Sequence, residues 1–417
     1  MSTTTETHAE TVAPTPTLGT MIGDYLAKVR GGDVGALPAV LGFLVLVALF
    51  SAMKPALFPT AYNAANLLQQ SAGVIYIAMG LVFILLLGEI DLGAGYTAGT
   101  SAAIMGVLMT KQGYPWPVAV IGCLVTGAVI GVVVGLLVAK LGIPSFVVTL
   151  STFLGLQGVM LWIIGNGGTI SIKNETILAI QNKNLPVLWG WVIFILAVAL
   201  YAGAGWLGRL RRAKAGLPVE PMAAFAAKLG VMVVILGLAT WILNVERSRN
   251  PGVTSLKGIP IIVPITAILV VVLTFLLQRT KFGRHIYAVG GNAEAARRAG
   301  INVNQVKIVC FVLGSLLAAL GGIVLASREN SISPTTGGST TLLLAVGAAV
   351  IGGTSLFGGK GRILDAIIGG LVIAVLNNGM PLITDKAAYQ YIVTALVLLL
   401  AASVDAISRR RAAATGR

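Results

Sequence analysis

The sequence is dominated by apolar stretches of about twenty residues that recur along nearly its whole length. Of its 417 residues, 56% are hydrophobic and only 10% are charged, whereas about a quarter of the residues in a soluble domain are charged. A helix needs roughly 20 apolar residues to cross a hydrocarbon core of about 30 Å. These stretches therefore predict an all-α, polytopic helical membrane protein.

Twelve apolar segments are candidates for membrane-spanning helices. Several of them, notably 92–110 and 340–353, are short or broken by glycine, so re-entrant helices are also expected and the number of spans is about 10–12. Irregular backbone inside a membrane is tolerated only where protein or a water-filled cavity surrounds it. The segments are 36–53, 65–87, 92–110, 115–139, 144–164, 187–204, 229–245, 259–278, 305–326, 340–353, 363–378 and 388–406.

The basic residues predict the orientation of the chain. Its formal charge of +15 could indicate a nucleic-acid partner, but the Lys and Arg residues lie in short clusters between apolar segments. Cytoplasmic loops of membrane proteins carry an excess of such residues. Placing both termini in the cytoplasm puts most of the 29 Lys and Arg residues there, including the clusters at 209–214 and 409–411. We expect a multi-pass protein with cytoplasmic termini and no nucleic-acid partner.

The hydrophilic segments divide the chain further. Residues 1–30 are polar, Thr-rich and without an apolar signal core, which indicates a disordered cytoplasmic tail. Residues 31–408 form the expected membrane domain, with an insertion at 205–258 and a cytoplasmic loop at 279–304. Residues 409–417 form a basic cytoplasmic tail.

The sequence offers no pattern for metal binding or covalent catalysis. Cys123 and Cys310 lie inside predicted spans and are expected to pack in the core. His8 and His285 are isolated, without zinc-ligand or catalytic spacing. We expect no enzyme activity, no metal site and no cofactor bound by this chain.

One stretch, "GGTSLFGGKGR", superficially resembles a phosphate-binding loop. Residue 354 is Thr where the first glycine of that motif belongs, and Gly361 follows Lys360 where Ser or Thr would bind magnesium. We therefore reject it as an ATP site. Any ATP hydrolysis coupled to this chain must come from a separate subunit.

Two carboxylates, Glu89 and Asp91, interrupt an otherwise uncharged run from 55 to 110 within "LLLGEIDLGAGY". A charge inside a membrane is costly, so such residues normally face a cavity, a partner or an interface. Together with Gly93 they indicate a break between two helices. Asp91 could cap the helix that begins near Leu92, or both carboxylates could form an inner gate that exchanges partners, or one could carry a proton.

A weak internal sequence similarity accompanies this break. "LGEIDLGAG" at 87–95 and "IGGTSLFGG" at 351–359 each end an apolar helix and precede a Gly-rich one. Both are expected on the cytoplasmic side, which fits a parallel duplication.

Amides and hydroxyls that interrupt the spans could line the path of a polar solute. Side chains of this kind also form hydrogen bonds between membrane helices, so packing is the alternative for each. The residues are Asn66, Gln69, Gln70, Thr149, Ser151, Thr152, Gln157, Asn377 and Asn378.

The loop at 279–304 contains the signals of a short surface helix. Asn292 is a candidate N-cap, Glu294 falls in the first turn, and Gly300 is a good terminator. A small apolar stripe beside a basic face could seat in a groove of another protein. The alternative is a solvated basic loop.

Three motifs carry a family resemblance. "TKFGRHIYAVGGNAEAARRAGIN" resembles the coupling region of bacterial ABC-type monosaccharide permeases, "GEIDLGAG" is similar to their Gly-x-Ile-Asp-Leu signature, and "IGGTSLFGGKGRILDAIIGGLVIAVLNNGM" is similar to their C-terminal segment. With the span pattern, the resemblance covers about 60–204 and 259–406. It implies an ABC importer transmembrane domain. The implied coupling helix contains Asn292, Glu294, Ala295, Ala296 and Gly300, flanked by Arg284, Arg297 and Arg298.

The resemblance also implies a function. We expect an inner-membrane permease subunit that imports a monosaccharide by alternating access, and the 205–258 region, which is similar to the longer xylose permeases, favours D-xylose. The implied partners are membrane lipid, an ABC ATPase that holds ATP and Mg²⁺, a periplasmic sugar-binding protein and a second permease copy. The alternatives are a proton-coupled symporter, a permease for another sugar, nucleoside or signalling molecule, and a membrane anchor for a regulatory ATPase.

Overall fold

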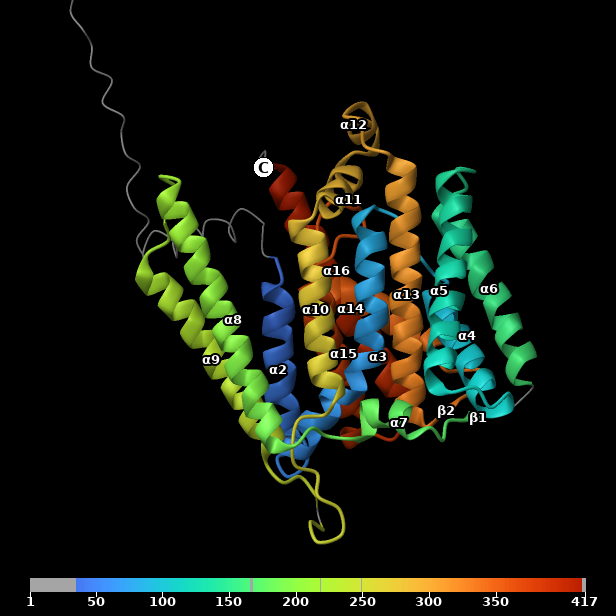
Figure 1. The fold of residues 1–417 in the computed structure, drawn as a ribbon, viewed down its shortest axis with the longest axis vertical. Coiled ribbons are helices and arrows are strands. Elements are labelled where there is room, and N and C mark those ends of the chain that lie inside the picture. Colours follow the sequence, from blue (N-terminus) through green and yellow to red (C-terminus); the bar gives the residue numbers. More distant parts are fainter. Residues whose placement is uncertain (1–34, 166–167, 218, 249, 415–417) are drawn as a thin grey trace, which may run out of the picture.

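The computed structural model describes residues 35–165, 168–217, 219–248 and 250–414. They form a helical bundle (Figure 1), as the sequence predicts. Among these residues, eight helices are long and apolar enough to cross a membrane. They are α3 (Ala61–Leu86), α5 (Trp116–Ala139), α6 (Ser145–Ile164), α8 (Val187–Lys214), α9 (Met222–Asn244), α10 (Ile262–Arg279), α13 (Val303–Glu329) and α15 (Ile363–Ile383).

Shorter or partly apolar helices occupy the other four predicted segments. They are α2 (Leu37–Met53), α4 (Ala94–Gly106, followed by a π-helical turn at Val107–Lys111), α14 (Ser339–Ile351) and α16 (Ala387–Ala414). A helix of 13 residues such as α4 is about 20 Å long, too short to cross a core of about 30 Å. Nearly all of α4 is buried by neighbouring helices, which satisfies the condition for a short helix inside a membrane.

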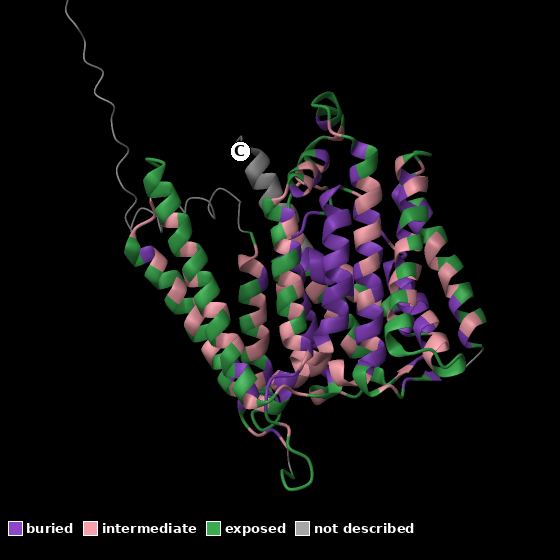
Figure 2. Ribbon diagram, in the orientation of Figure 1, coloured by how far each residue is buried: buried purple, intermediate pink, exposed green. Residues whose placement is uncertain are grey.

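The centre of the bundle is α3, and burial decreases outward from it (Figure 2). Glycines allow the central helices to approach closely. A Cβ on Gly80 of α3 would lie 2.7 Å from the carbonyl oxygen of Gly314 on α13, and one on Gly131 of α5 would lie 2.7 Å from that of Phe311. Because lipid tails are as apolar as the side chains, such close backbone packing is what holds membrane helices together.

Both cysteines lie in this glycine-rich core. Cys123 on α5 and Cys310 on α13 are each 0% exposed. The Cys123 thiol donates to the carbonyl oxygen of Ala319, with 3.7 Å between the two atoms. The prediction that both cysteines serve core packing is confirmed.

Two helix breaks meet on the side of the bundle that carries α11 (Lys281–Gly291) and α12 (Ala293–Arg298), which we call the α12 face. The first break, 87–93, joins α3 to α4, and the second, 352–362, joins α14 to α15. The backbone N–H of Gly359 donates to the carbonyl oxygen of Leu86 at 2.9 Å. The two similar sequences thus lie together on the α12 face. The longer helix, α3, precedes the first break, whereas the longer helix at the second break, α15, follows it. The sequence similarity is therefore not a simple repeat of one helix pair.

The insertion at 205–258 forms most of a hairpin of α8 and α9 at the edge of the bundle (Figure 1). Only 6% of the most apolar stretch of each helix is buried. Both helices extend beyond the predicted spans, because "RLRRAK" at 209–214 and the alanines after Met222 are good helix formers outside the apolar core.

The opposite side, which we call the α7 face, carries a short helix that the sequence reading missed. This helix, α7 (Glu175–Asn182), begins where the Asn174 side chain accepts hydrogen bonds from the backbone N–H groups of Thr176 and Ile177. Beside it, the two-residue strands β1 (Ile170–Ser171) and β2 (Ser331–Ile332) pair antiparallel. The predicted tail at 1–30 and residues 415–417 lie outside the described part of the chain, while α16 continues through the basic cluster at 409–411.

Candidate transport and coupling sites

The predicted short helix at 292–300 exists and has the predicted cap. The Asn292 side chain accepts a hydrogen bond from the backbone N–H of Ala295 at 2.9 Å, which satisfies a free donor of the first turn. Glu294 lies in that turn and pairs with Arg297 at 2.6 Å and with Arg298 at 3.3 Å. Gly300 ends the segment in the left-handed region, with φ +83°.

This segment projects from the α12 face (Figure 1) and is mostly exposed. Ala296 is the exception at 5% exposed, because it packs against the body of the protein. Ala296 therefore packs α12 against the bundle, whereas the exposed residues of the loop remain available to a partner. The exposed residues are Arg284, Asn292, Glu294, Ala295, Arg297, Arg298 and Gly300.

The preceding helix, α11, is seated on both helix breaks. A Cβ on Gly290 would lie 1.8 Å from the carbonyl oxygen of Leu86 and 2.8 Å from the backbone nitrogen of Gly359. The Tyr287 hydroxyl donates to the carbonyl oxygen of Gly361 at 2.7 Å. A force applied to α12 would thus reach both breaks through α11.

The two carboxylates of the first break have different partners. Glu89 forms an ion pair with Lys307 in the first turns of α13, and their side chains are 15% and 22% exposed. Asp91, 4% exposed, accepts a hydrogen bond from the backbone N–H of Gly93 at 2.8 Å. Asp91 therefore binds backbone at the helix start, as predicted, but α4 begins at Ala94 and not near Leu92. The intervening residues, Leu92 and Gly93, form a bend.

We expect transport to depend on the ion pair between Glu89 and Lys307. Glu89→Gln leaves the half-buried Lys307 ammonium without its partner. The free energy of unfolding should fall by an amount between about 1 kcal/mol, typical of an exposed pair, and about 3–5 kcal/mol, typical of a buried one. Either single neutralisation should slow solute uptake and lower the melting temperature. The swap of Glu89→Lys with Lys307→Glu should recover much of both. A swap as impaired as the single variants would show that the pairing itself is unimportant.

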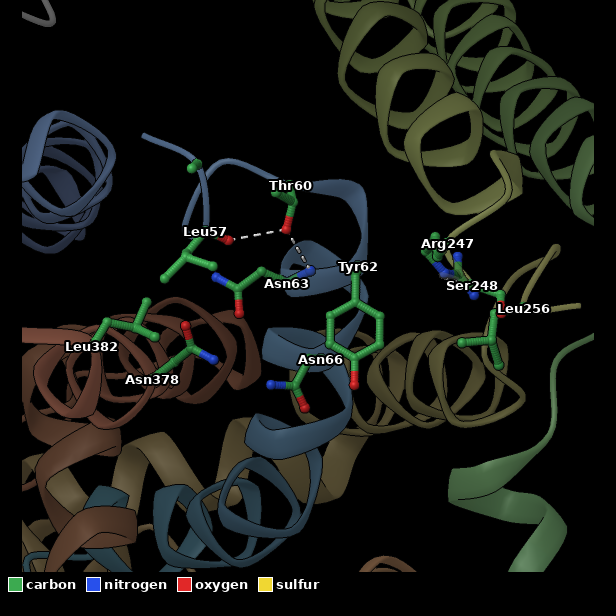
Figure 3. A pocket seen from close by; sticks show the side chains of 11 residues that line it. Leu57, Thr60, Tyr62, Asn63, Asn66, Arg247, Ser248, Leu256, Asn378 and Leu382 are labelled. Carbon is green, nitrogen blue, oxygen red and sulfur yellow. Dashed lines mark hydrogen bonds between the residues drawn. The ribbon is translucent and has the colours of Figure 1, made fainter. Parts of the chain in front are cut away.

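A cavity of about 670 Å³ opens on the α7 face. Figure 3 shows that its side chains come from the loop before α3, the start of α3, the end of α15 and the loop after α9. Its polar residues offer hydroxyl, amide and guanidinium groups, which suit a neutral polyhydroxy solute. The lining residues are Ala56, Leu57, Thr60, Tyr62, Asn63, Asn66, Arg247, Ser248, Leu256, Asn378 and Leu382.

Two predicted path residues, Asn66 and Asn378, meet at this cavity. The Oδ1 atom of Asn66 accepts from the Arg328 guanidinium at 3.0 Å. The Oδ1 atom of Asn378 is buried and accepts no hydrogen bond from the described residues. An unpaired buried acceptor is costly.

The loop after α9 is held in place by Glu246 and Arg247. Arg247, 8% exposed, donates to the carbonyl oxygens of Leu243 and Gly258. The Glu246 carboxylate accepts from the backbone N–H groups of Ser248 at 3.0 Å and Leu256 at 2.9 Å, and from the Ser255 hydroxyl at 2.7 Å. These hydrogen bonds, led by that from the Ser248 N–H, lower the pKa of Glu246 from 4.5 to about 2.

This low pKa gives the loop a defined pH dependence. Because the pKa is lowered on folding, the stabilisation is present above the ordinary pKa of 4.5 and is lost as the pH falls through about 2. Hydrogen exchange of 245–258, corrected for its intrinsic pH dependence, should show the loop equally protected at pH 7 and pH 6. Glu246→Gln should lower that protection at both values. Wild-type protection that collapses near pH 4.5 would contradict the assignment.

The other predicted path residues lie away from the cavity. On α6, Thr149 donates to the carbonyl oxygens of Ser145 and Ile90, while Ser151 and Thr152 bond back to carbonyls of their own helix. Gln69 exchanges hydrogen bonds with Gln181 of α7. Gln70, Gln157 and Asn377 are half-buried and do not line the cavity. For these seven residues a transport role stays a prediction.

Comparison with known proteins agrees with this geometry. The family described as branched-chain amino acid transport system / permease component matches residues 63–402. The chain belongs to this family. Its relatives are transport permeases, so the chain is a transport subunit and not an enzyme.

Curated relatives cover almost the full length of the chain. The xylose transport system permease protein XylH of Escherichia coli K12 is 35% identical over 89% of this chain and 92% of its own. XylH of Haemophilus influenzae is 33% identical over 92% and 99%. The ribose import permease protein RbsC of E. coli K12 is 33% identical over 88% and 92%. No solved structure matches the chain.

Sequence reasoning missed several residues of these sites. Asn63 lies one turn before Asn66 on α3, and that spacing could have revealed a polar helix face. Lys307 lies 218 positions from Glu89, and no local pattern pairs them. Arg247 follows a predicted span, where it was counted only as a loop charge.

Proposed function

We propose that this chain is the permease subunit of an ATP-driven ABC importer that carries a monosaccharide, with D-xylose as the first candidate. The observation that carries the proposal is the exposed α12 on an α11 that is seated on both helix breaks. This arrangement occurs in a chain 35% identical to a xylose permease. In the proposed orientation the α12 face is cytoplasmic and the α7 face is periplasmic, in agreement with the positive-inside rule.

In this mechanism the sugar arrives from a periplasmic binding protein at the cavity beside Asn66 and Asn378. The amide and hydroxyl groups of the cavity wall can form hydrogen bonds with a sugar, while the Arg247 guanidinium is already bound to the carbonyl oxygens of Leu243 and Gly258. A separate ATPase binds α12 of each of two permease copies and holds ATP and Mg²⁺. Drawing the two α12 segments together moves α11 and thereby both helix breaks, which alternates access between the two faces.

The cargo is tested in proteoliposomes that contain the permease, its ATPase and its binding protein. We expect uptake of labelled D-xylose that requires ATP and is unchanged by a protonophore. Unlabelled ribose, arabinose and galactose then rank the specificity by competition. ATP-dependent uptake of a nucleoside without uptake of any of these sugars would contradict the sugar assignment while leaving the coupling mechanism standing.

A further inference from the structure

The α8–α9 hairpin and the end of α10 enclose a basic pocket on the α12 face that the transport mechanism does not use. Its volume is about 460 Å³. Four cations, Arg209, Arg212, Lys228 and Arg279, line it together with one carboxylate, that of Glu220. The excess of positive charge favours an anionic occupant.

Two of these cations already have partners within the pocket wall. Lys228 pairs with Glu220 at 2.5 Å. Arg209 donates to the carbonyl oxygen of Glu220, and its guanidinium lies 5.7 Å from the centre of the Phe225 ring. Arg212 and Arg279 have no ion pair among the described residues. A guanidinium presents a planar set of donors that matches a phosphate group, so these two residues could hold a phosphate between them.

The pocket lies at the depth of a lipid headgroup. Arg279 is the last residue of α10, whose 18 residues span about 27 Å, close to the thickness of the hydrocarbon core. Arg209 and Arg212 lie in the last turns of α8, beyond its apolar stretch. Lys228 lies in the second turn of α9.

Below the pocket, the helices present apolar surface that the described chain leaves uncovered. Ile268, Val272 and Phe275 are 66%, 54% and 63% exposed, and their spacing places them on the same face of α10 as Arg279. The hairpin diverges from α10 toward the α12 face (Figure 1), and much of its surface is exposed (Figure 2). Inside a bilayer, acyl chains are the apolar material that covers such a surface.

We infer that this pocket binds an anionic phospholipid. Its phosphate lies between Arg212 and Arg279, and its acyl chains run along α8 and α10. Basic pockets between membrane helices attract anionic headgroups, and each basic residue adds to the attraction. The lipid would fill the space between the hairpin and the bundle, and so connect the 205–258 insertion to the rest of the permease.

The experiment uses the full purified chain in neutral detergent. Native mass spectrometry counts the phosphatidylglycerol and phosphatidylcholine molecules that remain bound to wild type, to the pocket variant Arg212→Gln/Arg279→Gln and to the control Lys140→Gln/Arg211→Gln. The control removes the same charge from the α12 face, and Arg211 adjoins Arg212 without lining the pocket. Insertion and melting temperature are measured for each protein.

We expect wild type and control to retain phosphatidylglycerol alike, and the pocket variant to bind it about ten-fold more weakly or worse. Phosphatidylcholine retention should be weak and equal in all three proteins. Equal phosphatidylglycerol binding by the pocket variant and wild type, or equal loss in the control, would overturn the inference. Competition by the deacylated headgroup glycerophosphoglycerol at equal concentration would also overturn it, because the site would then bind a soluble phosphate.

Discussion

Glu294→Lys is expected to leave the permease folded in the membrane and to abolish its association with the ATPase. The two ion pairs it breaks are more than half exposed, so their loss costs about 1 kcal/mol or less each. Reversing a charge within a protein interface costs about 2–5 kcal/mol, which is at least about thirty-fold in affinity. Co-purification with the ATPase and ATP-driven uptake measure the effect.

Glu175→Lys is the matched control for this charge reversal. Glu175 is also an exposed residue in the first turn of a short helix and pairs with one cation, Lys183 at 3.4 Å, but it lies on the α7 face. The control should bind the ATPase like wild type. Normal ATPase binding and uptake by Glu294→Lys would refute the assignment of α12 as the coupling segment.

Gly290→Ala is expected to disconnect α11 from the helix breaks. The added methyl group would lie 1.8 Å from the Leu86 carbonyl oxygen, so α11 must shift away from both breaks. Overpacking of this kind costs about 1–3 kcal/mol or more. We expect uptake to be lost and ATP hydrolysis to become independent of sugar, while the exposed residues of α12 still bind the ATPase.

Gly291→Ala provides a control one residue away. A Cβ at Gly291 meets no atom within 4 Å, and alanine favours the helix, so this variant should transport normally. If Gly290→Ala is too unstable for transport measurements, a lower melting temperature than that of Gly291→Ala still reports the contact. Normal uptake and stability in Gly290→Ala would show that α11 is not seated on the breaks as the structure places it.

Local signals in the sequence predicted much of this molecule. Apolar length located the twelve helical segments, and the spacing of Asn292, Glu294 and Gly300 predicted a capped helix whose cap the structure confirms. These predictions succeed because hydrophobic length and capping depend on neighbouring residues. The exact start of α4 was wrong by two residues, because the chain after Asp91 bends at Leu92 and Gly93 before the helix begins.

Long-range contacts could not be predicted in this way. The Glu89–Lys307 pair and the contact of Gly290 with Leu86 join segments about two hundred residues apart, and only the packing of α3, α11 and α13 brings them together. The cavity on the α7 face also forms only when segments far apart in the sequence pack together. Of the nine polar residues predicted for the solute path, Asn66 and Asn378 lie at its wall, whereas Asn377, next to Asn378 on α15, does not.

The central claim is that α12 transmits work done by an ATPase that this chain does not contain. The most direct test measures sugar accumulation against a gradient in sealed proteoliposomes, with the permease alone and with its ATPase, binding protein and ATP. We predict accumulation only with the ATPase and ATP present, and none driven by a proton gradient. Accumulation by the permease alone under a proton gradient would contradict the account.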